Sequence, residues 1–244
     1  MVRLHVPWCR KDDVMSTGQS SLISRMFMGA AATILVTCAM TSEARADGAC
    51  DSALKRVDAA LNSYKSLDLH YTMVTQEPGK ASTTMKLRTR FKAKKKKKRQ
   101  FTELLAPADL KGTKVLSLSP VKMWIYLPSF RKVRRVASHT SDQSFLGTAF
   151  SAADMNLTRY SGDYGCAKSG NQLDLKARDG KAVTYGRIVM TIDPAKHLPT
   201  EIKYFDKGGS HVKTETRKNY FCDAKVCTAR DMKMINHAKG GLWS

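Results

Sequence analysis

The sequence lacks three features that would assign it to common classes of protein. Outside residues 26–40, no apolar run approaches the roughly 20 residues that a membrane-spanning helix needs. No G-x-S-x-G, H-E-x-x-H, P-loop or G-x-G-x-x-G motif occurs. Acidic residues are scarce, at 21 Asp and Glu against 42 Lys and Arg, so the net charge is +21. The chain therefore carries none of the common hydrolase or nucleotide-binding motifs and is strongly cationic.

The sequence also lacks a set of residues arranged for catalysis. His139 lies near Ser141 and Asp142, but members of a catalytic triad usually converge from separate segments rather than from neighbouring positions. The cysteines do not follow C-x-x-C spacing, and no histidine lies suitably near two of them, which disfavours a metal site. We therefore expect a protein that is not an enzyme, with no catalytic residue, no cofactor and no metal.

The N-terminus has the pattern of a targeting segment. Arg25 precedes the apolar run 26–40 (MFMGAAATILVTCAM), and residues 44–46 (ARA) form a small-x-small cleavage site. This predicts a signal peptide over residues 1–46 that is cut after Ala46, and one mature domain, 47–244, in the periplasm. We expect Met15 to be the true start, which would leave residues 1–14 untranslated; the alternative is that they belong to an unusually long n-region. Lipidation at Cys38 is a weaker alternative, because Thr37 is a poor residue before a modified cysteine.

The positive charge needs an anionic partner. Behind a signal peptide, the available polyanions are anionic lipid surfaces rather than nucleic acid, so we expect contact with a membrane surface and none with nucleic acid. The densest basic run is the candidate for that contact: Lys94, Lys95, Lys96, Lys97, Lys98 and Arg99. The alternative is a solvated turn and edge strand, in which lysines discourage pairing with another chain.

Four cysteines remain after the predicted cut, and an oxidising compartment favours two disulfides. Three pairings are possible. Cys222 and Cys227 bracket an expected hairpin turn, so their bridge is favoured, which leaves Cys50 to pair with Cys166.

The mature chain changes its hydrophobic period after its first segment. Residues 51–66 carry apolar groups at the three-and-four spacing of an amphipathic helix. From residue 67 onwards apolar and polar residues alternate in about ten expected strands, separated by Gly, Pro and Asp turns. A long single-layer sheet must curl and cover its apolar face. We therefore expect a mainly β fold with some α: a curved antiparallel sheet forming an open or half β-barrel, with an N-terminal helix and a lid-like loop at 144–155 over its concave apolar face.

Four short motifs carry a resemblance to a known family. Their residues are 107–113 (PADLKGT), 123–128 (MWIYLP), 131–136 (RKVRRV) and 144–151 (SFLGTAFS). Their order and spacing resemble those of the outer-membrane lipoprotein-sorting family, relatives of the Lol lipoprotein carriers. The similarity is specific over about fifty residues, because the motifs occur together.

This resemblance implies an open β-barrel whose apolar concavity binds lipid or the acyl chains of lipoproteins. The expected function is that of a periplasmic lipid or lipoprotein carrier in outer-membrane lipoprotein sorting or envelope lipid transport, with an inner-membrane transporter or an outer-membrane acceptor as partner. The alternative is a periplasmic sensor of lipid or lipoprotein signals that acts through a membrane partner. The candidate lipid-binding residues are Trp124, Tyr126, Phe145, Leu146, Phe150, Tyr71 and Met73. The signature basic residues are Arg131, Arg134 and Arg135.

The chain departs from the family pattern within the expected lid. Alanine stands at Ala149, Ala152 and Ala153, where the family usually has two acids and one aromatic residue. Asp154 and Asp142 are then the candidates to meet the signature arginines. How the lid is fastened is left open at this point.

Overall fold

The computed structural model describes residues 43–244, apart from 95–96, 120–121, 138–142, 158 and 224–225. Most of the expected signal peptide, residues 1–42, therefore lies outside the described residues. Residues 43–46, which precede the expected cut, belong to the first turn of a helix.

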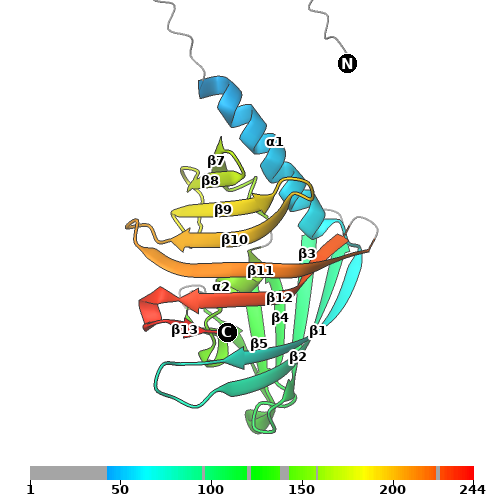
Figure 1. Ribbon diagram of the computed structural model, residues 1–244. Helices are drawn as coiled ribbons and strands as arrows, with labels where there is room; N and C mark the ends of the chain where they lie inside the picture. Colours follow the sequence, from blue (N-terminus) through cyan, green and yellow to red (C-terminus); the bar gives the residue numbers. More distant parts are fainter. Residues whose placement is uncertain (1–42, 95–96, 120–121, 138–142, 158, 224–225) are drawn as a thin grey trace, which may run out of the picture. The chain divides into compact units, whose positions relative to one another are not determined.

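The first half of the described chain forms an antiparallel meander, here called sheet A (Figure 1). Each strand pairs with the next one along the chain, so the order in space is the order in sequence. The strands are β1 (Ser66–Thr75), β2 (Thr83–Lys94), β3 (Lys97–Ala106), β4 (Lys114–Ser119), β5 (Lys122–Leu127) and β6 (Lys132–Val136).

The second half forms another antiparallel meander, sheet B, whose order runs from β13 back to β7. Its strands are β7 (Tyr164–Ser169), β8 (Gln172–Ala177), β9 (Arg187–Asp193), β10 (Leu198–Phe205), β11 (His211–Asp223), β12 (Val226–Asn236) and β13 (Leu242–Trp243). The two expected disulfides are confirmed. Cys222–Cys227 closes the β11–β12 hairpin, and Cys50–Cys166 ties the N-terminal helix to β7.

The two sheets join edge to edge through one β-bridge. The amide of Gln76, just after β1, donates to the carbonyl of Trp243 at 2.9 Å, and the amide of Trp243 returns a bond to Gln76 at 3.1 Å. The thirteen strands thus form one curved series with β6 at one end and β7 at the other. This confirms the expected open, curved antiparallel sheet.

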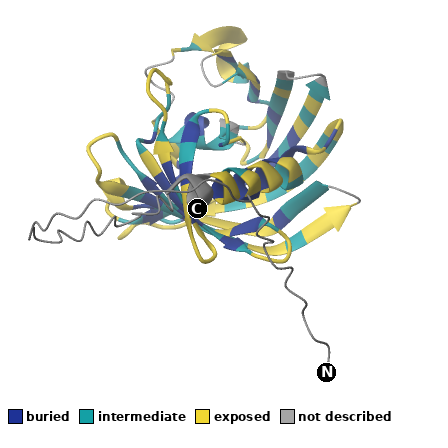
Figure 2. Cartoon of the chain, turned by 90° about the horizontal axis from the view of Figure 1, so that it is seen from above, coloured by how far each residue is buried: buried dark blue, intermediate teal, exposed yellow. Residues whose placement is uncertain are grey.

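Helix α1 (Glu43–Asn62) packs its apolar side on sheet B and exposes its outer side (Figure 2). Leu54 and Val57 have no exposed surface and belong to the main core with residues of β8, β9 and β10. The helix ends where side chains satisfy its last carbonyls: the Asn62 amide donates to the carbonyl of Asp58, and the Ser63 hydroxyl to that of Ala59. The expected helix, residues 51–66, thus began several residues late and ended four residues late.

The expected lid region lies between the two sheets (Figure 1). We call residues 144–157 the plug segment; it contains a 3₁₀ turn (Phe145–Gly147) and the short helix α2 (Ala152–Asn156). Phe145 packs against β2, β3, β4 and β5, whereas Phe150 packs into the main core against sheet B. The segment therefore fills the concavity with side chains from both of its ends.

Candidate functional site

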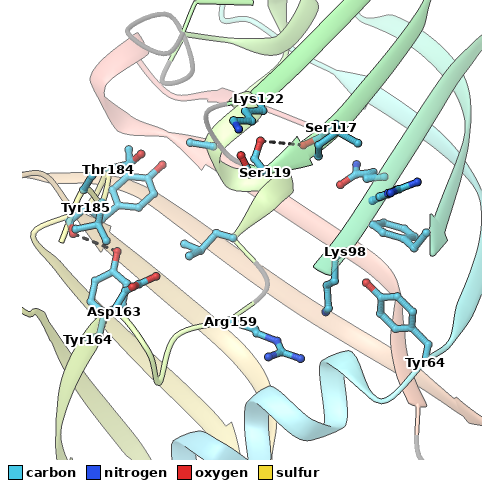
Figure 3. A pocket seen from close by; sticks show the side chains of 18 residues that line it. Tyr64, Lys98, Ser117, Ser119, Lys122, Arg159, Asp163, Tyr164, Thr184 and Tyr185 are labelled. Atoms are coloured by element: carbon cyan, nitrogen blue, oxygen red, sulfur yellow. Dashed lines mark hydrogen bonds between the residues drawn. The ribbon is translucent and has the colours of Figure 1, made fainter. Parts of the chain in front are cut away.

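One cavity of about 660 Å³ lies beside the plug segment, where sheet A approaches the loop before β9 (Figure 3). Its neutral wall is mainly aromatic and aliphatic: Tyr64, Phe91, Leu118, Ala153, Leu157, Tyr164, Ala182, Val183 and Tyr185, with Gln100, Ser117, Ser119 and Thr184 among them. Its charged residues are Lys98, Arg99, Lys122, Arg159 and Asp163. A mixed wall of this kind suits a ligand with an apolar body and a negatively charged end.

Tyr64 and Phe91 form one corner of the apolar wall. Their ring centroids lie 5.7 Å apart in an edge-to-face arrangement. Tyr64 follows the end of α1, and Phe91 lies on the concave side of β2, in register with Gln100 of β3. On the opposite side, the Tyr164 hydroxyl donates to the carbonyl of Tyr185 at 3.2 Å, which fixes the loop before β9 against β7.

Lys98 and Arg159 bring positive charge to this corner (Figure 3). The Lys98 ammonium donates to Oδ1 of Asn62 and lies 4.7 Å from the centre of the Tyr64 ring. Burial, together with the positive charge of Arg159, lowers the pKa of Lys98 to about 8, and the negative charge of Asp58 opposes this shift. The two cations are therefore close enough to repel each other.

Asp58 of α1 holds the segment that carries Arg159. Its carboxylate accepts hydrogen bonds from the amides of Tyr160 at 2.9 Å and Ser161 at 3.0 Å, and from the Ser161 hydroxyl at 2.6 Å. Because Arg159 directly precedes these two residues, the contact sets where its backbone leaves the cavity wall. The site thus depends on a contact between residues 102 positions apart.

Asp154 fastens the plug segment to the wall of the cavity. Its carboxylate accepts from the backbone amide of Ser151 at 2.7 Å, from the Tyr185 hydroxyl and from the Lys213 ammonium. The backbone amide of Asp154 in turn donates to the Ser151 hydroxyl at 3.2 Å, so the first turn of α2 is closed reciprocally. Tyr185, which lines the cavity, is thereby held in place by the plug segment.

The structure separates the seven candidate lipid-binding residues into two groups. Tyr71, Met73, Phe145, Leu146 and Phe150 all pack in the concave interior, but none of them lines the cavity. Trp124 and Tyr126 point to the outer face of sheet A, since their neighbours Met123 and Ile125 take the inner positions of β5. Leu116, which pairs with Trp124, is 36% exposed on that outer face.

The described signature arginines do not meet Asp154, one of the two acids suggested for them. Arg131, Arg134 and Arg135 are exposed on or beside β6, and Arg134 lies 5.9 Å from the Phe130 ring. Asp154 pairs with Lys213 instead, because the plug segment faces β11 of sheet B. Asp142 and His139 lie outside the described residues.

The positions of the three plug-segment alanines leave room only for small side chains. Ala149 is fully buried, and Ala152 and Ala153 are nearly so. Ala152 packs against Val115 and Met123 of sheet A, and Ala153 lines the cavity. A larger side chain at Ala152 would collide with sheet A, and one at Ala153 would enter the cavity.

The structure describes only part of the basic run, residues 94–99. Lys95 and Lys96 lie outside the described residues, and of Lys94 and Lys97 only the backbone is described. Lys98 and Arg99 are in β3 and line the cavity, a placement that the membrane-surface interpretation did not include. Lys98 and Arg99 pair with β2, whereas the pairing of β3 with β4 begins only at Gln100.

Sequence reasoning missed Tyr64, Phe91, Arg159 and the loop 182–185 as one site. The apolar spacing of α1 and β2 marked Tyr64 and Phe91 as inward-facing, but nothing local links them to Arg159. Within the residues that the structure describes, no group of three His, Cys, Asp or Glu side chains could hold a metal ion. None of the described helices is long and apolar enough to cross a membrane.

Comparison with known proteins places this fold. A family model with the description "-like: Uncharacterized protein" matches residues 96–242, which is more than half of the chain. A DUF1329 family protein from Desulfovibrio piger has a similar solved structure, with a TM-score of 0.74 and 23% identity over 82% of this chain and 91% of that one. A search of curated proteins finds no match.

Two further solved structures share the fold. A Vibrio parahaemolyticus domain designated an outer membrane lipoprotein-sorting protein has a TM-score of 0.73 and 22% identity, over 81% of this chain and 89% of that one. A LolA superfamily protein from Nitrosomonas europaea has a TM-score of 0.64 and 18% identity, over 80% and 91%. The chain belongs to the family whose model matches residues 96–242, and it shares its fold with the DUF1329 and LolA-superfamily structures. At these identities the LolA-like structures establish the fold, and the cavity is the feature of this chain that bears on its function.

Proposed function

We propose that this LolA-like chain is a periplasmic carrier that binds a lipid or the acyl chain of a lipoprotein in the cavity beside the plug segment. The observation that carries the proposal is the cavity itself. Its volume of about 660 Å³ falls within the roughly 300–1,000 Å³ typical of small-molecule sites. Its neutral wall is mostly apolar, so each buried methylene of an acyl chain would contribute about 0.8 kcal/mol to binding.

The expected cellular compartment supports the same proposal. Two disulfides suit an oxidising compartment, as does the expected export segment. A carrier must take its cargo from one membrane and deliver it to another, so we propose an inner-membrane transporter or an outer-membrane acceptor as its partner. The positive charge of the chain favours its approach to anionic lipid surfaces at either membrane.

Native mass spectrometry of the protein, expressed as the full chain and collected from a periplasmic extract without detergent, tests this proposal. We expect a discrete added mass in the lipid range that is lost on extraction with organic solvent. Val183→Trp would fill the cavity from the loop before β9 and should abolish the added mass. Val133→Trp, at a position 65% exposed on β6 and outside the cavity, is the matched control and should retain it. Equal cargo in Val183→Trp and the wild type would show that the cavity is not the binding site.

A further inference from the structure

The charged groups around the cavity are almost all positive. Lys98, Arg99, Lys122 and Arg159 line it, against a single carboxylate, that of Asp163. Asp163 already pairs with Lys181, whose ammonium lies 3.3 Å from its Oδ1. The residues that line the cavity thus carry an excess of positive charge, which its single carboxylate does not neutralise.

Two of these cations sit together without a carboxylate between them. Among the described residues, neither Lys98 nor Arg159 forms an ion pair, and the partners of Lys98 are the neutral Asn62 amide and Tyr64 ring. The nearest acid, Asp58, uses its carboxylate to bind the backbone and hydroxyl of residues 160 and 161. Two cations held near each other in a partly desolvated wall raise the free energy of the empty site, and an anion placed between them would lower it.

We propose that Lys98 and Arg159 bind the anionic head group of an amphiphile whose apolar chain lies along Phe91, Leu157 and Val183. The shared chemistry is a carboxylate or phosphate on a single long chain, as in a free fatty acid or a lysophospholipid. This inference rests on the proposed lipid-carrying function and deepens it, because it names the class of ligand and the residues that select it.

The surroundings of the two cations agree with this assignment. Tyr64 offers its hydroxyl and ring at the boundary between the charged corner and the apolar wall, and Arg159 acts electrostatically on Tyr64 as well as on Lys98. A guanidinium can bind a carboxylate or phosphate through two parallel hydrogen bonds, while an ammonium acts as a point charge beside it. Burial and Arg159 disfavour the charge of Lys98 and lower its pKa. A bound anion would stabilise that charge.

Ligands that differ only in the head group provide the test. The periplasmic protein is stripped of lipid and titrated, below their micelle concentrations, with oleate, oleyl alcohol, lysophosphatidylglycerol and lysophosphatidylcholine, in competition with a fluorescent fatty-acid probe. At pH 7 we expect oleate or lysophosphatidylglycerol to bind at least tenfold more tightly than its uncharged or zwitterionic counterpart. The pair that shows the larger ratio identifies the source of the anion as a fatty acid or a phospholipid.

Variants connect that preference to the two residues. Lys98→Met and Arg159→Met should each weaken binding of the preferred anion at least fivefold, while binding of oleyl alcohol changes less than twofold, which also shows that the cavity is intact. Lys168→Met on β7 and Arg56→Met on α1 are exposed cations outside the cavity, and both should bind like the wild type.

The outcomes separate the two proposals. Equal affinities within both pairs of ligands, or variants that keep the preference for anions, would overturn the head-group site and leave the carrier function standing. Failure of all four amphiphiles to bind would overturn the carrier function together with this inference.

Discussion

Lys213 and Asp154 form an ion pair inside the concave face of the sheet, with Nζ and Oδ2 2.5 Å apart and the two side chains 8% and 2% exposed. Lys213 lies on β11 of sheet B, and Asp154 lies in the plug segment. Because the same carboxylate also accepts from Ser151 and Tyr185, one buried acid joins the plug, the sheet and the cavity wall.

Removal of the cation from this pair should be costly. Lys213→Met leaves a buried carboxylate without its counter-ion, and we expect a loss of about 3–5 kcal/mol in the free energy of unfolding. Urea denaturation at pH 7 measures it. The exposed pair Lys203–Glu201, at 3.2 Å, is the matched control, and Lys203→Met should cost less than about 1 kcal/mol. Equal effects of the two substitutions would show that the buried pair does not fasten the plug segment.

The fold could be predicted in outline because its main determinants are local. Alternation of apolar and polar residues marked β1 and β2, and the three-and-four spacing of Leu54 and Val57 marked α1. The start of β3 was expected only as one alternative, a solvated turn and edge strand, because its first residues are a lysine run. Its pairing with β2 overrides the local preference for a turn.

The site was less predictable, because it depends on contacts that no local pattern records. Asp58 and Ser161 are 103 residues apart, and only the packing of α1 on sheet B brings them together. Phe145 and Phe150 were expected in a lid over the concavity, and their apolar character was read correctly, but whether they bind cargo stays a prediction. Trp124 and Tyr126 belong to a recognised motif, yet motif membership does not tell which face of β5 they occupy.

The two disulfides should contribute unequally to stability. A bridge stabilises mainly by restricting the unfolded chain, and the Cys50–Cys166 loop spans 116 residues against five for Cys222–Cys227. The loop-entropy relation gives about 5 kcal/mol for the first and about 2 kcal/mol for the second. Urea denaturation of Cys50→Ala/Cys166→Ala and Cys222→Ala/Cys227→Ala should therefore show the larger loss in the first double variant. The reverse order would mean that loop length does not govern the effect here.

Buried tyrosines should make the protein lose stability steeply above pH 10. Burial raises the pKa of Tyr71 and Tyr220 to about 12, and raises those of Tyr160, Tyr164 and Tyr204 further. A raised folded-state pKa contributes stability that is fully present below the unfolded value, near 10, and is lost as pH rises towards the folded value. Each such tyrosine adds about 1.4 kcal/mol per pH unit to the slope of unfolding free energy against pH.

Urea denaturation between pH 8 and pH 11 tests this, with Tyr71→Phe as the informative variant. Above pH 10, the unfolding free energy of this variant should fall less steeply with pH, by about 1.4 kcal/mol per pH unit. Below pH 9 its dependence on pH should be unchanged. A wild-type unfolding free energy that stays flat from pH 10 to pH 11 would show that these hydroxyls ionise freely in the folded protein.

Lys98→Met should stabilise the empty protein and weaken the response to ligand. Burial and the charge of Arg159 lower the folded-state pKa of Lys98 from its ordinary value of 10.5 to about 8, so its charge costs stability at neutral pH. Between these two values the unfolded chain binds more protons, and the penalty fades as pH rises. Compared with wild type at each pH, the variant should therefore be more stable at pH 7, and its advantage should disappear by about pH 10.5.

A saturating anionic amphiphile should narrow this difference. Ligand at 100 times its dissociation constant adds about 2.7 kcal/mol to the free energy of unfolding, and a tenfold loss of affinity removes about 1.4 kcal/mol of that gain. Thermal denaturation at pH 7 with and without oleate compares the two proteins directly. A stabilised empty variant with a smaller gain from oleate is the result expected if Lys98 is kept for its ligand at the expense of stability. An equal gain in both proteins would assign Lys98 to the fold alone, since an ammonium that only fills space cannot change the response to an anion.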